Sequence, residues 1–234
     1  MKKQIPNIIT LMNLFSGCIA IVMAFQGNLA AVFIWVVVAA VFDFFDGLAA
    51  RALGVSSKIG VELDSLADVV SFGVAPAAAV FVLLQNFMLF PPFLLPLKEF
   101  IPYTAFLIPV FSAYRLAKFN IDTRQTTSFL GLPTPANALF WISYVYGVSQ
   151  IQSEGFLYIT LVLIIGLSLL MVSEIPMFSL KIKNLKRKGN EKQFLLIALM
   201  IAFVSVWQIN GIAGGVLAYI AISVLTGEKK KSNR

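Results

Sequence analysis

The chain has 234 residues, of which 59% are hydrophobic and only 12% are charged, and its mean hydropathy is +0.88. This composition excludes an ordinary soluble domain, a disordered chain and a collagen-like fibre. The single cysteine, Cys18, excludes a disulfide within the chain, and the lack of histidine excludes mechanisms built on a histidine base or metal ligand. The apolar runs reach the roughly 20 residues needed to cross about 30 Å of hydrocarbon, which predicts a membrane protein.

Eight membrane-spanning helices are predicted from the apolar runs. In chain order they cover roughly residues 8–26, 29–52, 60–86, 100–118, 133–149, 155–173, 193–208 and 211–226. The break at 208–211 is expected to be a tight turn between two short helices, because one continuous final span would place the basic residues 229–231 outside. The fold class expected is therefore all-α, a polytopic helical bundle.

The basic residues fall in short gaps between the apolar runs and indicate the topology. If the Met1-Lys2-Lys3 start is cytoplasmic, Lys98 is the only one of the 18 Lys and Arg residues placed outside, as the positive-inside rule requires. Both termini are then cytoplasmic. The net charge of +7 is not arranged as a stripe with interleaved aromatics, so nucleic acid is not an expected partner.

The same pattern predicts the organisation and location of the chain. We expect a catalytic transmembrane core over 1–180, a basic cytoplasmic loop over 181–192, a transmembrane hairpin over 193–226 and a basic tail over 227–234. The first apolar run lacks a small-x-small cleavage site and is predicted to be a mature helix rather than a signal peptide. A multi-pass protein of the cell (plasma) membrane is expected.

Four of the five aspartates lie within or at the ends of apolar helices, at Asp43, Asp46, Asp64 and Asp68. A charged carboxylate at the centre of a membrane helix costs about 2.5 to 3.5 kcal/mol on insertion scales. Asp46 precedes Arg51 by about 7.5 Å along a helix, so the acids are expected just below the cytoplasmic surface, where water reaches them.

The helical period places these acids on facing surfaces. At 100° per residue, Asp43 and Asp46 share one face of the 29–52 helix, and Asp64 and Asp68 share one face of the next. A short loop joins the two helices, so the four carboxylates are expected to converge on one pocket. Oxygen ligands favour Mg²⁺, Mn²⁺ or Ca²⁺, and two such ions would offset the repulsion and assist a displacement at phosphorus.

Two other roles for the acids remain open from the residues alone. They could line an ion or proton pathway, as in a cation-coupled transporter, or Asp43 and Asp46 could pair with Arg51 and Lys58 as a structural cluster. Transporters of that kind tend to have two related halves, and no second copy of the acidic pattern is present here. The transporter is therefore a remote alternative.

The spacing of these residues resembles a known signature. The segment Asp43-Phe-Phe-Asp46-Gly47-Leu-Ala-Ala50-Arg51, followed after eight residues by Gly60-Val-Glu-Leu-Asp64-Ser-Leu-Ala-Asp68, resembles in full the signature of the CDP-alcohol phosphatidyltransferases. Segments 6–13, 71–77, 115–120 and 131–136 resemble the phosphatidylserine synthase branch of that family. From the first to the last, these segments extend over residues 6–136, about half of the chain.

The resemblance implies a six-helix core around a polar cavity open to the cytoplasm, where a CDP-linked lipid meets an alcohol and CMP leaves. It implies two divalent cations, Mg²⁺ or Mn²⁺, held by Asp43, Asp46, Asp64 and Asp68, with Asp68 also acting as the base for the incoming hydroxyl. A homodimer is implied as well. The residues expected to bind the nucleotide part of the CDP-lipid are Thr10, Asn13, Gly47, Ala50, Arg51, Lys58 and Gly60.

The acceptor predicted from the resemblance is L-serine, attacking CDP-diacylglycerol or an ether-lipid analogue. A pocket for serine requires a cation for its carboxylate, and the planar guanidinium of Arg115 suits this role. The expected serine site consists of Ser71, Arg115, Lys118 and Asn120. A sister enzyme that uses glycerol 3-phosphate or inositol phosphate is the alternative, because Arg115, Lys118 and Arg124 could instead bind a phosphorylated acceptor.

Overall fold

A computed structural model describes residues 2, 4–122, 129–151, 153–179 and 190–226. In chain order its helices are α1 (Gln4–Phe25), α2 (Leu29–Ala52), α3 (Lys58–Asp68), the π-helical η1 (Val69–Val74), α4 (Ala75–Gln85), the 3₁₀ helices η2 (Pro92–Leu97) and η3 (Ile101–Phe106), α5 (Leu107–Ile121), α6 (Thr134–Val148), α7 (Glu154–Val172), α8 (Glu191–Trp207), the 3₁₀ turn η4 (Gln208–Asn210) and α9 (Gly211–Thr226). Two short strands, β1 (Phe129–Leu130) and β2 (Pro176–Met177), pair antiparallel. The expected all-helical architecture is confirmed. The two short strands are the one non-helical pairing in the described residues.

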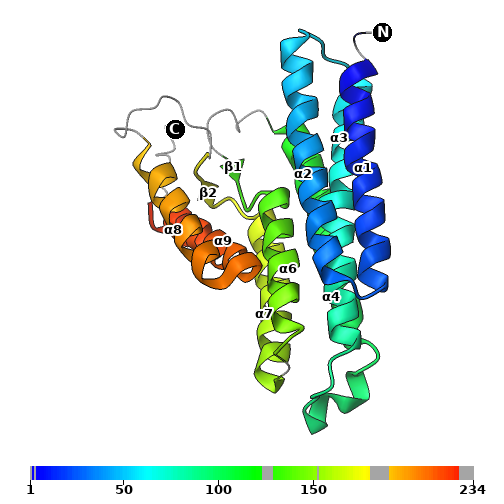
Figure 1. The fold of residues 1–234 in the computed structure, drawn as a ribbon, viewed down its shortest axis with the longest axis vertical. Coiled ribbons are helices and arrows are strands. Elements are labelled where there is room, and N and C mark those ends of the chain that lie inside the picture. The colour runs from blue at the N-terminus through cyan, green and yellow to red at the C-terminus, as the bar shows by residue number, and fades with distance from the viewer. Residues whose placement is uncertain (1, 3, 123–128, 152, 180–189, 227–234) are drawn as a thin grey trace.

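The α2–α3 connection positions the functional region and is determined by local capping. The Ser57 hydroxyl accepts a hydrogen bond from the Gly60 backbone N–H at 3.0 Å and begins α3. Gly54 takes a φ of +62°, a left-handed conformation that favours glycine, just after α2 ends. The loop is short, so α2 and α3 run antiparallel, as the sequence predicts (Figure 1).

The helices pack around α4, which is almost entirely buried. Its alanines Ala75 and Ala77–Ala79 have no more than 2% of their surface exposed, and their small side chains let α1, α2 and α6 approach closely. Figure 1 shows α1 and α2 side by side and upright, with α8 and α9 as an inclined pair beyond α6. Large apolar side chains, including Phe15, Ile34 and Val162, point away from this core.

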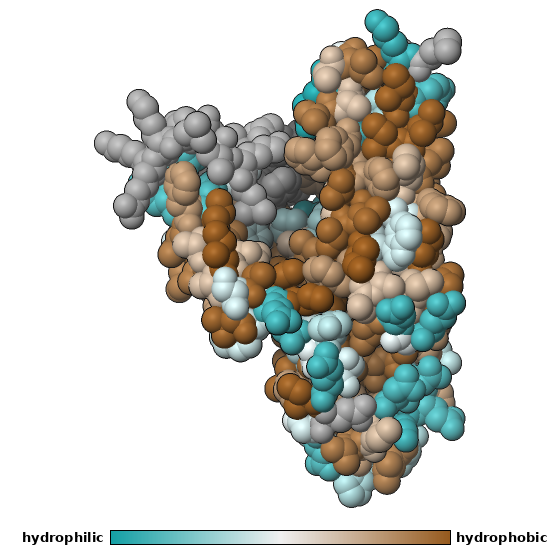
Figure 2. Space-filling view, viewed as in Figure 1, coloured by the Kyte–Doolittle hydropathy of each residue, from teal (hydrophilic) through white to brown (hydrophobic). Residues whose placement is uncertain are grey.

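The apolar exterior is that of an integral membrane protein. Five helical runs in the described residues are long and apolar enough to cross a membrane, namely 4–25, 29–52, 58–85, 154–172 and 191–226. Figure 2 shows apolar surface over the middle of the visible face, between hydrophilic patches near its two ends. The helices α5 and α6 have 15 residues each, about 22 Å, which is shorter than the hydrocarbon core. That all eight predicted spans cross the bilayer therefore stays a prediction.

The predicted tight turn after α8 is confirmed. Gln208 has a φ of +52°, and the chain folds back so that α9 packs against α8. A Cβ on Gly211 would overlap the Phe203 carbonyl, and one on Gly215 would overlap the Met200 thioether, so glycines permit this close approach. Residues 180–189 and 227–234, which make up most of the predicted basic loop and the whole tail, lie outside the described residues, as does Arg124.

Candidate metal and nucleotide site

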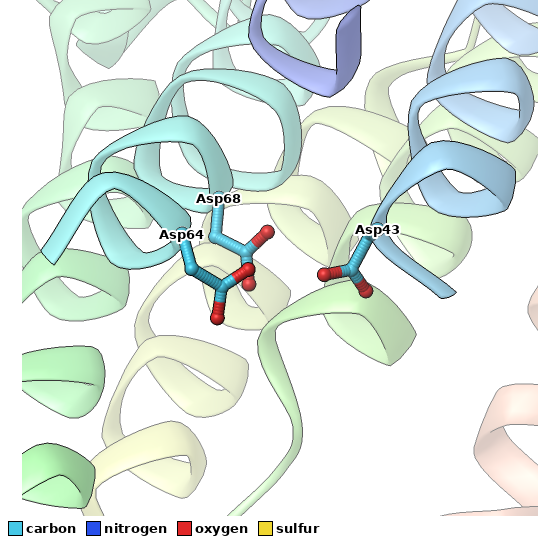
Figure 3. A group of neighbouring side chains, drawn as sticks. All are labelled: Asp43, Asp64 and Asp68. Atoms are coloured by element: carbon cyan, nitrogen blue, oxygen red, sulfur yellow. The ribbon is translucent and has the colours of Figure 1, made fainter. Parts of the chain in front are cut away.

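Three of the four predicted acids converge on one point. Asp43 projects from α2, and Asp64 and Asp68 project from α3 toward it (Figure 3). One carboxylate oxygen from each residue lies within 4.8 Å of the others. Asp68 is buried, whereas Asp43 and Asp64 are partly exposed. This geometry follows from the four-residue spacing of Asp64 and Asp68, which stacks them on one helical face.

The fourth acid, Asp46, lies one turn further along α2 toward the α2–α3 loop. It is buried, and its Oδ2 accepts a hydrogen bond of 2.7 Å from the Thr10 hydroxyl on α1. Hydrogen bonding to an ionised carboxylate is among the stronger kinds, so this contact joins α1 firmly to α2. Asp46 therefore lies beside the three-acid cluster and connects it to the neighbouring pocket.

That pocket has a volume of about 160 Å³ and opens between α1, α2, α3 and the loop that joins α2 to α3. Its lining residues are Pro6, Asn7, Thr10, Asp46, Gly47, Ala50, Val55, Ser56, Ser57, Gly60, Val61 and Asp64. Two acids and several small residues in this lining suit a phosphate-bearing ligand that reaches bound metal ions. The pocket and the three-acid cluster form one continuous site.

The residues present fit divalent cations. Among the residues that the structure describes, Asp64 Oδ1 is buried without a hydrogen-bond partner, and an anionic oxygen left in this state is stabilised by a cation. Within the described ranges, no ion pair joins any of the four acids to Arg51 or Lys58, and both basic side chains are exposed. The salt bridges that the structural-cluster alternative requires are therefore not formed in this part of the chain.

Apart from Asn13, the residues that were predicted to bind the nucleotide fall into two groups. Thr10, Gly47, Ala50 and Gly60 line the pocket, whereas Arg51 and Lys58 lie outside its lining. A Cβ placed on Gly47 would lie 3.2 Å from an Arg51 guanidinium nitrogen, so Arg51 folds back over the pocket wall.

Asn13 is fully buried and bonds to the acid cluster rather than lining the pocket. Its Nδ2 donates to Asp68 Oδ1 at 3.2 Å. The same residue receives a second hydrogen bond at its backbone carbonyl, from the Ser71 hydroxyl at 3.0 Å. Ser71 is itself fully buried, so its hydroxyl is engaged by the α1 backbone.

The other three residues that were predicted to bind the serine substrate lie on α5. Arg115 is 93% buried, and its Nη1 donates to the Thr134 hydroxyl at 3.2 Å, while its Nε has no partner among the described residues. Lys118 pairs with Glu174 at 4.0 Å, and both basic residues line a small second pocket next to α7. Asn120 is exposed, and its Nδ2 donates to Ser65 Oγ at 2.9 Å. The four residues thus share no single pocket, and Arg115 is the most buried cation.

Several residues of the site have no counterpart in the sequence-based assignment. Asn7 and Ser57 line the nucleotide pocket, and both would contact a Cβ placed on Gly60. Outside this pocket, Asn137 in the first turn of α6 is fully buried, and neither of its amide atoms has a hydrogen-bond partner in the described part of the chain.

Comparison with known proteins agrees with this geometry. The family model described as CDP-alcohol phosphatidyltransferase matches residues 3–172. A CDP-diacylglycerol–serine O-phosphatidyltransferase of Helicobacter pylori is 32% identical over 94% of the chain and 89% of its own length, and one of Bacillus subtilis is 33% identical over 74% and 89%. An archaetidylserine synthase of Methanothermobacter thermautotrophicus is 32% identical over 73% and 68%. With the acid cluster and adjoining pocket in place, the chain belongs to the CDP-alcohol phosphatidyltransferase family.

Proposed function

We propose that the protein transfers the phosphatidyl group of CDP-diacylglycerol to the hydroxyl of L-serine, giving phosphatidylserine and CMP. The observation that carries the proposal is the convergence of Asp43, Asp64 and Asp68 beside a pocket that contains Asp46. The printed names of the H. pylori and B. subtilis relatives support serine as the acceptor. Because one relative is an archaetidylserine synthase, an ether-linked lipid remains an alternative substrate.

The acids would hold two divalent cations, Mg²⁺ or Mn²⁺. When bound, such cations neutralise pyrophosphate charge and stabilise the negative charge that develops on the leaving phosphate oxygens. Asp43, Asp46, Asp64 and Asp68 supply only oxygen ligands, which is the donor set these ions prefer. The pocket lined by Thr10, Gly47 and Gly60 would bind the nucleotide side of the pyrophosphate.

In the mechanism that we propose, Asp68 accepts the proton of the serine hydroxyl as that oxygen attacks the lipid-linked phosphorus. Asp68 is suited to this step because it is the most deeply placed acid of the cluster and has one oxygen positioned by Asn13. A positioned general base contributes typically 10²- to 10⁴-fold to rate. Release of CMP through the pocket mouth, which we place on the cytoplasmic side, completes the turnover.

The orientation of the buried Arg115 side chain supports a role in binding the serine carboxylate. Within the described part of the chain its Nε has no hydrogen-bond partner and its Nη1 donates to the neutral Thr134 hydroxyl, so the guanidinium has a donor left for an anionic ligand. A carboxylate binds a guanidinium through two parallel hydrogen bonds, which would satisfy that donor.

The first test measures CMP release by detergent-purified protein given CDP-diacylglycerol and Mn²⁺ or Mg²⁺. L-Serine, glycerol 3-phosphate, inositol phosphate and no acceptor are compared in parallel. We expect release that depends on serine and that is lost on chelation of the metal or in Asp64→Asn. Release with a phosphorylated acceptor alone would retain the catalytic chemistry and reject serine, whereas no release with any acceptor would reject the transferase proposal.

A second test concerns the acceptor pocket. Arg115→Ala is expected to raise the KM for serine by at least tenfold while the KM for CDP-diacylglycerol stays within twofold, because charge-assisted hydrogen bonds contribute about 1.5 to 3 kcal/mol. Arg115→Lys keeps the charge without the planar guanidinium, so its KM for serine should lie between those of wild type and Arg115→Ala. An Arg115→Ala enzyme with an unchanged serine KM would remove Arg115 from the acceptor site.

We also propose that the active site faces the cytoplasm and that the protein works as a homodimer. Arg51 and Lys58, which end α2 and begin α3, lie at the same end of the bundle as the pocket, and this end is cytoplasmic under the positive-inside rule. Cross-linking in membranes before solubilisation tests the dimer.

A further inference from the structure

The helix that carries Asp64 and Asp68 changes its winding immediately after Asp68. The α-helical turns of α3 end at Asp68, η1 is π-helical over Val69–Val74, and α4 resumes at Ala75. Pro76 explains part of this change, because it has no backbone N–H to donate to the preceding turn and its ring would crowd a carbonyl there. Single π-helical turns inside α-helices occur frequently at functional sites.

The π-helical turn is attached to α1 by an unusually close contact. A Cβ on Gly17 would overlap the Ser71 Oγ and come within 2.7 Å of the Ser71 Cα, so only glycine allows this approach. The Ser71 hydroxyl then donates to the Asn13 carbonyl at 3.0 Å. One turn of α1 and one turn of η1 are therefore joined by packing and by a hydrogen bond.

Asn13 uses this attachment to reach the acid cluster. Its backbone is bonded to Ser71 and its side chain is bonded to Asp68, which lies three residues before Ser71. A carboxylate only accepts hydrogen bonds when ionised, so the Asn13 amide must present Nδ2 to Asp68. That bond occupies Asp68 Oδ1 and restricts rotation of the carboxylate, while the second oxygen stays free of it.

We propose that Asn13 is a positioning residue that orients the Asp68 carboxylate toward Asp43 and Asp64. The inference rests on the proposed function, in which these acids hold metal ions, and it assigns Asn13 a role other than the nucleotide contact expected from the sequence. Two observations favour it: Asn13 does not appear in the lining of the nucleotide pocket, and it is fully buried against Asp68. Groups that orient metal ligands typically change metal affinity or activity by 10- to 100-fold when removed.

The test compares Asn13→Ala and Asn13→Leu with wild type. Asn13→Leu keeps nearly the size and branching of the side chain but removes the amide donor without adding a charge, so it separates the hydrogen bond from a packing defect. Ser16→Ala is the matched control, because the buried Ser16 hydroxyl on the same helix bonds to the Met12 carbonyl of α1 itself and, in the described residues, to no acid of the cluster. Elution as a single species in detergent and the melting temperature verify that each variant is folded.

Two readouts are used. Binding of Mn²⁺ to the purified protein without substrate is followed by loss of the free-ion electron paramagnetic resonance signal, and kinetics give kcat and the KM for CDP-diacylglycerol. We expect both Asn13 variants to bind Mn²⁺ at least tenfold more weakly and to lose kcat, with the lipid KM within twofold of wild type. Ser16→Ala should match wild type in each quantity.

The outcomes separate the inference from the proposed function. A variant set with unchanged Mn²⁺ affinity and a raised lipid KM would overturn the positioning role and return Asn13 to the nucleotide site. Wild-type protein that binds no Mn²⁺ and releases no CMP would instead overturn the proposed metal-dependent transfer. If Asn13→Ala fails to fold, Asn13→Leu decides the matter by the same readouts, and the milder Ser71→Ala, which removes the hydroxyl bonded to the Asn13 carbonyl, should show a smaller loss of Mn²⁺ affinity.

Discussion

Asp68→Asn is expected to lower kcat by about 10²- to 10⁴-fold while leaving CDP-diacylglycerol binding intact. The loss follows because an amide cannot accept the proton of the attacking hydroxyl, and this range is the usual contribution of a general base. Binding should persist because the pocket is lined by Asp46, Gly47 and Asp64 rather than by Asp68. CMP release measures the first quantity, and competition by a non-reacting CDP-lipid measures the second.

Glu62→Gln provides the matched control for this prediction. Glu62 lies on the same helix, α3, but is exposed and outside the acid cluster, so the same carboxyl-to-amide change should leave kcat within twofold of wild type. An Asp68→Asn enzyme that turns over at the wild-type rate would remove Asp68 from the role of base.

Gly17→Ala should destabilise the protein and reduce its activity, although the change adds a single methyl group. That methyl would overlap Ser71, including its backbone Cα, and backbone cannot move aside as a flexible side chain can. Overpacking of this kind typically costs 1–3 kcal/mol, which should lower the melting temperature in detergent. Displacement of η1 would also disturb Asp68, so kcat should fall together with stability.

Gly166→Ala is the corresponding control, because Gly166 lies within the membrane helix α7 and a Cβ there meets no heavy atom within 4 Å. Alanine has the higher helix propensity, so this variant should be at least as stable as wild type. Equal melting temperatures for Gly17→Ala and wild type would show that α1 can move away from η1 without loss.

The positions of the acids were predictable from the sequence because they depend on local geometry. A helical period and one short loop suffice to bring Asp43 near Asp64 and Asp68, and the predicted 29–52 helix coincides with α2. The final turn at Gln208 was also predictable, since the charge of the tail required it. The first case depends on local helical geometry, and the second depends on a charge rule that the sequence shows directly.

The contacts of α1 and α5 were not predictable in the same way. The pairing of Asn13 with Asp68, and of Asn120 with Ser65, depends on the relative depth of helices that are distant in sequence. The π-helical turn alters that depth and rotates every residue after Asp68, yet one proline is its only visible signal. The hydroxyl of Ser71 was thus assigned to serine binding, whereas the structure engages it with the α1 backbone.

The turn of α2 that carries the acids has a second surface. Asp43 and Asp46 point into the protein, while Phe44 and Phe45, between them in sequence, are 61% and 49% exposed on the outside. A lipid whose phosphate is held by the acids can therefore leave its acyl chains among the surrounding lipids throughout turnover. Under the proposed function, the supply of one substrate and the departure of the lipid product are both two-dimensional diffusion within a leaflet. The rate would then follow the mole fraction of CDP-lipid in the bilayer rather than its bulk concentration.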